Sequence, residues 1–132
     1  MIAVREIDGT TVVEVDGEFA ERTAEEFNGV ISGLLDQNRV RVVLNLRRAQ
    51  WTSLKALKWL VGHVRRFRAR NGDLKLAGLN PYFANLLELT GTLTLFDVYV
   101  TVDDAVAAFT PRLVPVEPAV AVRMVSADDE AL

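Results

Sequence analysis

The sequence contains no cysteine, which excludes disulfides and thiolate metal sites. It has a single histidine, His63, without the clustered carboxylates that a metal site or a histidine-based nucleophile relay would need. Neither a G-x-x-x-x-G-K nor a G-x-G-x-x-G phosphate loop occurs. Because no group of residues assembles into a reaction centre, we predict a protein that is not an enzyme and needs no cofactor.

Long hydrophobic runs are also missing, because charged residues interrupt every apolar stretch well short of a membrane span. The first residues, Met1–Glu6, lack the pattern of a signal peptide. We therefore expect a cytoplasmic protein with no membrane insertion. The chain has 132 residues, half of them hydrophobic, which is enough for one domain with a buried core.

The net charge of −3 hides a strong segregation of charge along the chain. Residues 39–75 hold eleven of the fifteen lysines and arginines and a single acid, Asp73, whereas acids dominate on both sides of this block. The folded protein should therefore have a positive face. Nucleic acid is not an expected partner, because the protein is acidic overall and the basic block lacks a groove-reading or base-stacking motif.

Strand patterns alternate with helix patterns after an opening hairpin, in which Asp8-Gly9 supplies the turn between residues 2–7 and 11–15. Further strands are predicted at 40–46, 74–78 and 98–100. Helices are predicted from Thr23 to about Gln37, from near Ser53 to Arg70, from Pro81 to Leu89 and from Ala105 to Phe109. This order predicts an α/β fold over residues 1–110, with one mixed sheet of about five strands and about four helices. Residues 111–132 are predicted to be a C-terminal tail that is either flexible or adds a strand at 120–125.

The helix near Ser53 is the most informative element, because it follows the buried strand 40–46 and its N-terminus exposes free backbone N–H groups. Its predicted core stripe comprises Leu54, Leu57, Leu60, Val61, Val64 and Phe67. We expect Ser53 to be its N-cap, Asn71-Gly72 to end it and Trp51 to fill an apolar position before it. Thr23 to Glu26 match a capping box for the preceding helix. His63 is expected at the surface or at the boundary of the core.

Several segments, in this order and spacing, resemble the STAS domain, the family of bacterial anti-sigma factor antagonists. The resemblance covers about residues 4–109 and lies in segments 15–19, 42–46, 86–91, 95–99 and 103–105. It implies a regulatory protein that binds an anti-sigma factor, often a serine kinase, and so releases the sigma factor. It also implies a switch, because phosphorylation of a serine at the start of the second helix turns that binding off.

The chain departs from the family where the switch would lie. The family helix opens Asp-Ser-Ser/Thr-Gly-Leu, and an ungapped alignment places Ser53 at the aspartate, Leu54 at the phosphorylated serine, Lys55 at the next hydroxyl residue and Ala56 at the glycine. An earlier acidic position of the family falls on Ala20. Leucine has no hydroxyl to accept a phosphoryl group, so we predict a constitutive binding module. Ser53 is the alternative phosphoacceptor, although an N-cap role explains it as well.

Hydroxyl, apolar and basic residues around this helix start form the predicted partner-binding surface, which consists of Thr52, Ser53, Leu54, Lys55, Lys58, Trp59 and Arg66. Lys55, Lys58, Arg65, Arg66 and Arg70 are expected on its solvent side. Trp59 has two open interpretations: an interface anchor, or a ring that lies over apolar surface under cation–π contacts. The expected partner is an anti-sigma factor or a serine kinase-like regulator, and a homodimer stays possible. The alternative function is an accessory STAS subunit of a membrane transporter, of the lipid-trafficking ATPase type.

Overall fold

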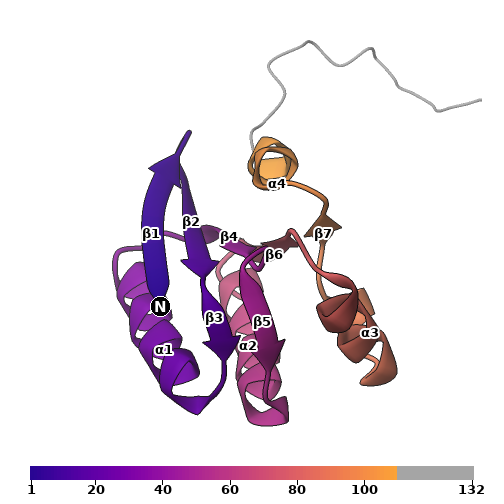
Figure 1. Cartoon of the computed structure of the whole chain (residues 1–132). Coiled ribbons are helices and arrows are strands. Elements are labelled where there is room, and N and C mark those ends of the chain that lie inside the picture. The colour runs from indigo at the N-terminus through magenta and orange to yellow at the C-terminus, as the bar shows by residue number, and fades with distance from the viewer. Residues whose placement is uncertain (110–132) are drawn as a thin grey trace, which may run out of the picture.

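Strands and helices alternate over residues 1–109, the part of the chain that the computed structural model describes (Figure 1). The strands are β1 (Ile2–Ile7), β2 (Thr10–Val15), β3 (Gly17–Phe19), β4 (Arg41–Asn45), β5 (Ala49–Thr52), β6 (Asp73–Ala77) and β7 (Val98–Tyr99). The helices are α1 (Glu21–Asp36), α2 (Leu54–Arg68), α3 (Pro81–Leu89), the short 3-10 helix η1 (Leu93–Leu95) and α4 (Val102–Phe109). The predicted α/β class is confirmed.

The main sheet has five strands in the order β1-β2-β4-β6-β7. β1 and β2 pair antiparallel, and all the other neighbours are parallel. Asp8 (φ 51°) and Gly9 (φ 80°) both have positive φ, as a two-residue hairpin turn of this twist requires. Each parallel pair needs a crossover, and α1 and α2 supply the first two. The predicted hairpin and mixed sheet are both confirmed.

The two faces of this sheet carry cores of unequal size. On the larger side, Val13, Leu44 and Leu76 pack against α1 and α2, which contribute Phe27 and Phe67 to the same cluster. On the other side, a smaller cluster lies under α4 and contains Val12, Val43, Ala77, Ala105 and Val106. Figure 1 shows α1 and α2 together on one side of the sheet and α4 alone on the other.

The sequence patterns did not predict β3 and β5, which pair in parallel as a second sheet of two strands. Trp51 lies in β5 opposite Glu18 of β3 and is 40% exposed. The prediction that Trp51 fills an apolar position is therefore wrong. The physical reason is that Ala49 and Thr52 at the two ends of β5 are buried, whereas the residues between them face outward.

Local signals placed most helix ends correctly. Asn71 adopts positive φ (63°) after α2, and Asn80 caps α3 with its side chain immediately before Pro81. The capping box at Thr23 is wrong, because α1 begins earlier, after Ala20, whose side chain makes no cap. The predicted tail, residues 111–132, lies outside the described residues.

Candidate protein-binding surface

The N-terminus of α2 is fixed by strand β5, which leads directly into it. The Ser53 hydroxyl oxygen accepts a hydrogen bond from the backbone N–H of Ala56 at 3.1 Å, so Ser53 is the N-cap that the sequence predicts. The Ser53 backbone N–H donates to the Phe19 carbonyl at 3.2 Å, which ties this turn to β3. The helix start is therefore held by the two-stranded β3–β5 sheet as well as by its own first turn.

Leu54, the first residue of α2, is 61% exposed, so its assignment to the core stripe is wrong. Leu57, Leu60, Val64 and Phe67 of that stripe are buried as predicted, whereas Val61 is only partly buried. The reason is tertiary: in Figure 1 the first turn of α2 extends past the tip of β5, so the sheet does not cover it. An apolar side chain therefore stands in solvent where the alignment places the family's phosphorylated serine.

A mostly apolar hollow of about 440 Å³ lies beside Leu54, between α2 and the turn that follows α3. Its lining residues are Leu54, Leu57, Lys58, Val61, Thr90 and Thr92. Hollows lined by apolar side chains with a few polar groups are typical binding sites. The exposed Leu54 is thus one edge of a larger apolar surface.

A second hollow of about 340 Å³ lies on the α1 side of α2 and is lined by Asn28, Lys58, Trp59, Gly62, His63 and Arg66. Trp59 is half-buried, and the Lys55 ammonium lies 5.2 Å from the centre of its ring. Both interpretations of Trp59 therefore have a structural basis: it packs partly on the core and also lines an open hollow. Lys58 lines both hollows and joins them into one surface.

His63 is buried between α1 and α2 at 6% exposure, so its expected place at the surface or boundary is corrected. Its ring meets the Phe27 ring edge-on at 5.6 Å, and its Nε2 atom shares a hydrogen bond with Asn28 Oδ1. Within the described residues its Nδ1 atom has no hydrogen-bond partner. Burial, helped by the positive charge of Arg66, lowers the pKa of His63 to about 4.

Thr52 differs from the other predicted contact residues because its side chain faces inward. It is 4% exposed, and its hydroxyl donates to the Phe19 carbonyl at 2.9 Å. Tyr82, which the sequence analysis missed, is 43% exposed, and its hydroxyl donates to the Thr52 carbonyl at 3.2 Å. The sequence predicted only that a helix begins at Pro81, and the fold brings Tyr82 of that helix next to β5.

The basic residues of α2 are exposed as predicted, and its first turn contains no acid. Arg70, just after the helix, already has a partner within the domain, because its guanidinium donates to the Leu35 carbonyl at 2.7 Å. Within residues 1–109, no cluster of three or more His, Asp or Glu is placed to hold a metal ion. Over the same residues, no helix has the length and apolar character to cross a membrane.

Comparisons with known proteins agree with this geometry. BtrV of Bordetella bronchiseptica, named as an anti-sigma factor antagonist, is 28% identical over 112 residues, which cover 85% of this chain and 97% of BtrV. The crystal structure of an anti-sigma factor antagonist from Mycobacterium paratuberculosis is 26% identical and matches with a TM-score of 0.73, over 82% of this chain and 92% of that one. A sulfate transporter family protein from Wolinella succinogenes is 20% identical and has a TM-score of 0.68, over 77% and 85% of the two chains.

The family comparison covers most of the fold, because residues 1–105 match the STAS domain. The match includes β1 to β7 and the start of α4, and therefore the α2 surface described above. The chain belongs to the STAS domain family, and the relatives that it matches include anti-sigma factor antagonists.

Proposed function

We propose that this chain is a non-catalytic regulatory module that binds an anti-sigma factor or a serine kinase-like regulator. The contact surface is the exposed start of α2 and consists of Ser53, Leu54, Lys55, Lys58, Trp59 and Arg66. Thr52 is buried beneath it and fixes the end of β5 through its hydrogen bond to Phe19. Trp51 and Tyr82 extend it with two exposed aromatic rings. Aromatic, arginine and central apolar residues are the types that dominate protein interfaces.

The exposed leucine at position 54 is the observation that carries this proposal. A side chain that is 61% exposed at the first turn of a helix gains little from the protein's own core. It contributes apolar area only when a partner covers it, at roughly 25 cal/mol per Å². The chain thus keeps the helix start that its relatives use and replaces the reactive hydroxyl with apolar contact area.

The same geometry supports binding without a phospho-switch. The Ser53 hydroxyl oxygen already caps α2 by accepting the Ala56 backbone N–H, which accounts for a serine at this position without phosphorylation. Leu54 has no acceptor group. The positive charge on α2 favours an acidic partner, because charge complementarity raises association rates and selects partners.

The binding experiment is calorimetry with a candidate anti-sigma factor or kinase-like regulator from the same organism. Leu54→Asp and Trp59→Ala should each weaken binding, Leu54→Asp by about tenfold or more because it places a charge on a desolvated contact. Leu89→Asp is the matched control, because Leu89 is 83% exposed but lines neither hollow of α2. Equal losses in the three variants, or no complex with the wild-type protein, would contradict the proposed surface.

The switch is tested separately by incubating the protein with the cognate kinase and ATP and measuring its intact mass. The wild-type protein should gain no phosphoryl group, whereas Leu54→Ser should gain one because it restores a hydroxyl at the exposed first turn. Ser53→Ala serves as the control for modification at the cap. A phosphorylated wild-type protein whose modification disappears in Ser53→Ala would show that Ser53 is the acceptor.

A transporter-associated role is the second candidate, and the likeness to the fold of a sulfate transporter family protein favours it. In that role the basic α2 face would contact an acidic subunit surface or anionic lipid headgroups. Co-sedimentation with vesicles that contain anionic lipid distinguishes the two roles. Salt-sensitive co-sedimentation that Lys58→Glu abolishes would favour the transporter role over the regulatory one.

A further inference from the structure

A third hollow lies away from α2, where the parallel strands end and α4 begins. Its volume is about 650 Å³, which is larger than either hollow beside α2. It is lined by Arg5 of β1, by Asn45 and Arg47 at the end of β4, by Gly78 and Leu79 after β6, and by residues 100–103 before and within α4. Crevices at the carboxyl ends of parallel strands are frequent ligand sites in open α/β sheets. Neither hollow beside α2 shares a lining residue with this third hollow.

Two arginines without acidic partners give this crevice its charge. Arg5 and Arg47 are both exposed, and neither forms a salt bridge to any residue between 1 and 109. By contrast, Arg39, just before β4, is paired, since its guanidinium lies 2.8 Å from the Glu6 carboxylate. The only acid among the lining residues is Asp103. Two guanidinium groups against one carboxylate leave a net positive charge in the crevice.

The floor of the crevice is formed by Asn45, Gly78 and the backbone of Arg47, which are closely packed. The Asn45 side-chain oxygen accepts the backbone N–H of Arg47 at 3.0 Å, and the Asn45 amide nitrogen donates to Glu14 at 3.3 Å. Gly78 has φ +73°, and a Cβ atom there would come within 3.1 Å of Arg47 Cβ and 3.2 Å of Asn45 Oδ1. The backbone and Cβ of Arg47 are therefore fixed, so a ligand has to order only the outer part of this side chain.

Apolar side chains form the rest of the wall. Leu79, Val100 and Val102 line the crevice, and Val100 is 84% exposed although it is a large hydrophobic residue. A ligand that fits both halves must combine an anionic group with an apolar body. Guanidinium groups bind phosphate oxygens with two parallel hydrogen bonds, which favours phosphate over a simple point-charge contact.

We propose that this crevice binds a small organic phosphate, with its phosphoryl oxygens between Arg5 and Arg47 and its apolar part against Leu79 and Val100. The site is separate from the proposed partner surface, so a ligand and a protein partner can bind at the same time. Its test needs no partner protein, and its failure would leave the proposed function untouched.

The experiment is a titration of the full-length, isotope-labelled protein with phenyl phosphate and with inorganic phosphate, followed by amide chemical shifts at constant ionic strength. Phenyl phosphate should give saturable shifts centred on Gly78, Leu79 and Thr101 and should bind more tightly than inorganic phosphate. Arg5→Gln and Arg47→Gln should each weaken binding about tenfold, the effect of removing one charge-assisted contact. Asp103→Asn should strengthen it severalfold, because the variant removes the opposing charge.

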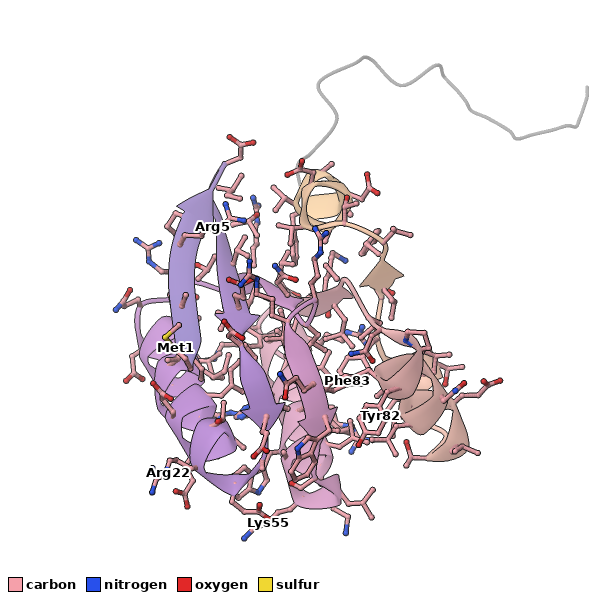
Figure 2. All side chains as sticks on the ribbon, viewed as in Figure 1. Met1, Arg5, Arg22, Lys55, Tyr82 and Phe83 are labelled. Atoms are coloured by element: carbon pink, nitrogen blue, oxygen red, sulfur yellow. The ribbon has the colours of Figure 1, made fainter. Side chains whose placement is uncertain are left out.

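Arg22→Gln is the matched control, because Arg22 is an exposed arginine of α1 at the opposite end of the molecule from Arg5 (Figure 2). This variant should bind phenyl phosphate as the wild-type protein does. Shifts that do not saturate, shifts spread over all basic surfaces, or equal weakening by Arg22→Gln would overturn the proposal. Equal affinity for the two phosphates would overturn the apolar part of the assignment.

Discussion

The two faces of the main sheet are closed in different ways. The face under α1 and α2 buries large aromatic and aliphatic side chains, with Phe27, Leu60 and Phe67 at 1% exposure or less. The face under α4 buries mainly valines and alanines, and α4 has only eight residues. Apolar area alone therefore stabilises the second face much less than the first.

A partly buried ionic contact supplements the smaller core. The Lys75 ammonium lies 3.1 Å from Asp73 Oδ2 and 3.0 Å from Asp97 Oδ2, and 4.7 Å from the centre of the Phe109 ring at the end of α4. Burial alone would lower the pKa of Lys75, but the hydrogen bonds to Asp97 and Asp73 raise it overall. The comparison shows that hydrophobic packing holds the α2 surface in place, whereas a charged cluster and a short helix hold the opposite side.

Truncating one core residue on each face should give the largest difference. Leu60→Ala should lower the free energy of unfolding by about 2–5 kcal/mol, since it leaves a cavity under α2. Val106→Ala removes less volume next to a small cluster and should cost about 1–2 kcal/mol. Denaturant unfolding of both variants measures the difference. Equal losses would contradict the unequal closure of the two faces.

Acid should destabilise the two faces in separate pH windows. The pKa of His63 is lowered from 6.5 to about 4, so the folded state favours the neutral ring. Its contribution is complete above pH 6.5 and is lost as the pH falls through 4, by about 3 kcal/mol in total, because the unfolded chain binds the proton first. His63→Gln should remove this pH dependence in denaturant unfolding between pH 7 and pH 4.

Asp73, on the other face, responds at lower pH. Burial opposes its ionisation, but hydrogen bonds from Arg68 and Lys75 lower the pKa of Asp73 below 3.8 overall. Its stabilisation is complete above pH 3.8 and is lost only below that value. A His63→Gln protein should therefore keep the acid transition below pH 4, and loss of both transitions would contradict the assignment.

Lys75 offers an intermediate effect that separates charge from packing. Lys75→Ala should cost about 1–3 kcal/mol, because it leaves two carboxylates close together beside the Phe109 ring. Lys75→Met keeps the volume and the apolar contact and should cost less. Thermal unfolding of the two variants measures the difference. If Lys75→Met is as damaging as Lys75→Ala, the ammonium charge rather than the side-chain volume stabilises the α4 face.

Local chemistry explains what could be predicted from the sequence. Asp8-Gly9, Asn71-Gly72 and Asn80-Pro81 each favour one backbone conformation by themselves, and the structure has the expected turn or helix end at each of them. β3 and β5 could not be predicted in the same way. Strands of three and four residues have no measurable period, and each is stable only because the other pairs with it.

In the candidate site, too, the features set by neighbouring residues in the sequence could be predicted, whereas those set by tertiary contacts could not. Ser53 was predicted as the N-cap because capping depends on four consecutive residues. The exposure of Leu54, Trp51 and Tyr82 and the burial of His63 depend on which element lies opposite. Leu54 is exposed because α2 begins beyond the sheet. His63 is buried because it packs against α1, where it shares a hydrogen bond with Asn28. Helical periodicity cannot supply either fact.

The smallest effects come from the two N-caps, which begin helices on opposite faces of the main sheet. Ser53 Oγ and Thr101 Oγ1 each accept a backbone N–H of their helix, at 3.1 Å in both cases. Replacing either residue with alanine should cost about 1 kcal/mol. In α2 the loss should appear in global stability, because large buried side chains hold the rest of that helix in the core. In α4 it should appear as local opening, because one eight-residue helix covers that face.

Hydrogen exchange of backbone amides distinguishes the two outcomes. Thr101→Ala should speed exchange throughout α4 while leaving α2 at its wild-type rate. Ser53→Ala should speed exchange in the first turn of α2, and amides elsewhere in the domain should speed up only as far as the lower global stability requires. Uniform exchange changes in Thr101→Ala would show that α4 unfolds only together with the rest of the domain. In that case the ionic cluster around Lys75 would couple α4 to the sheet more tightly than its small apolar core suggests.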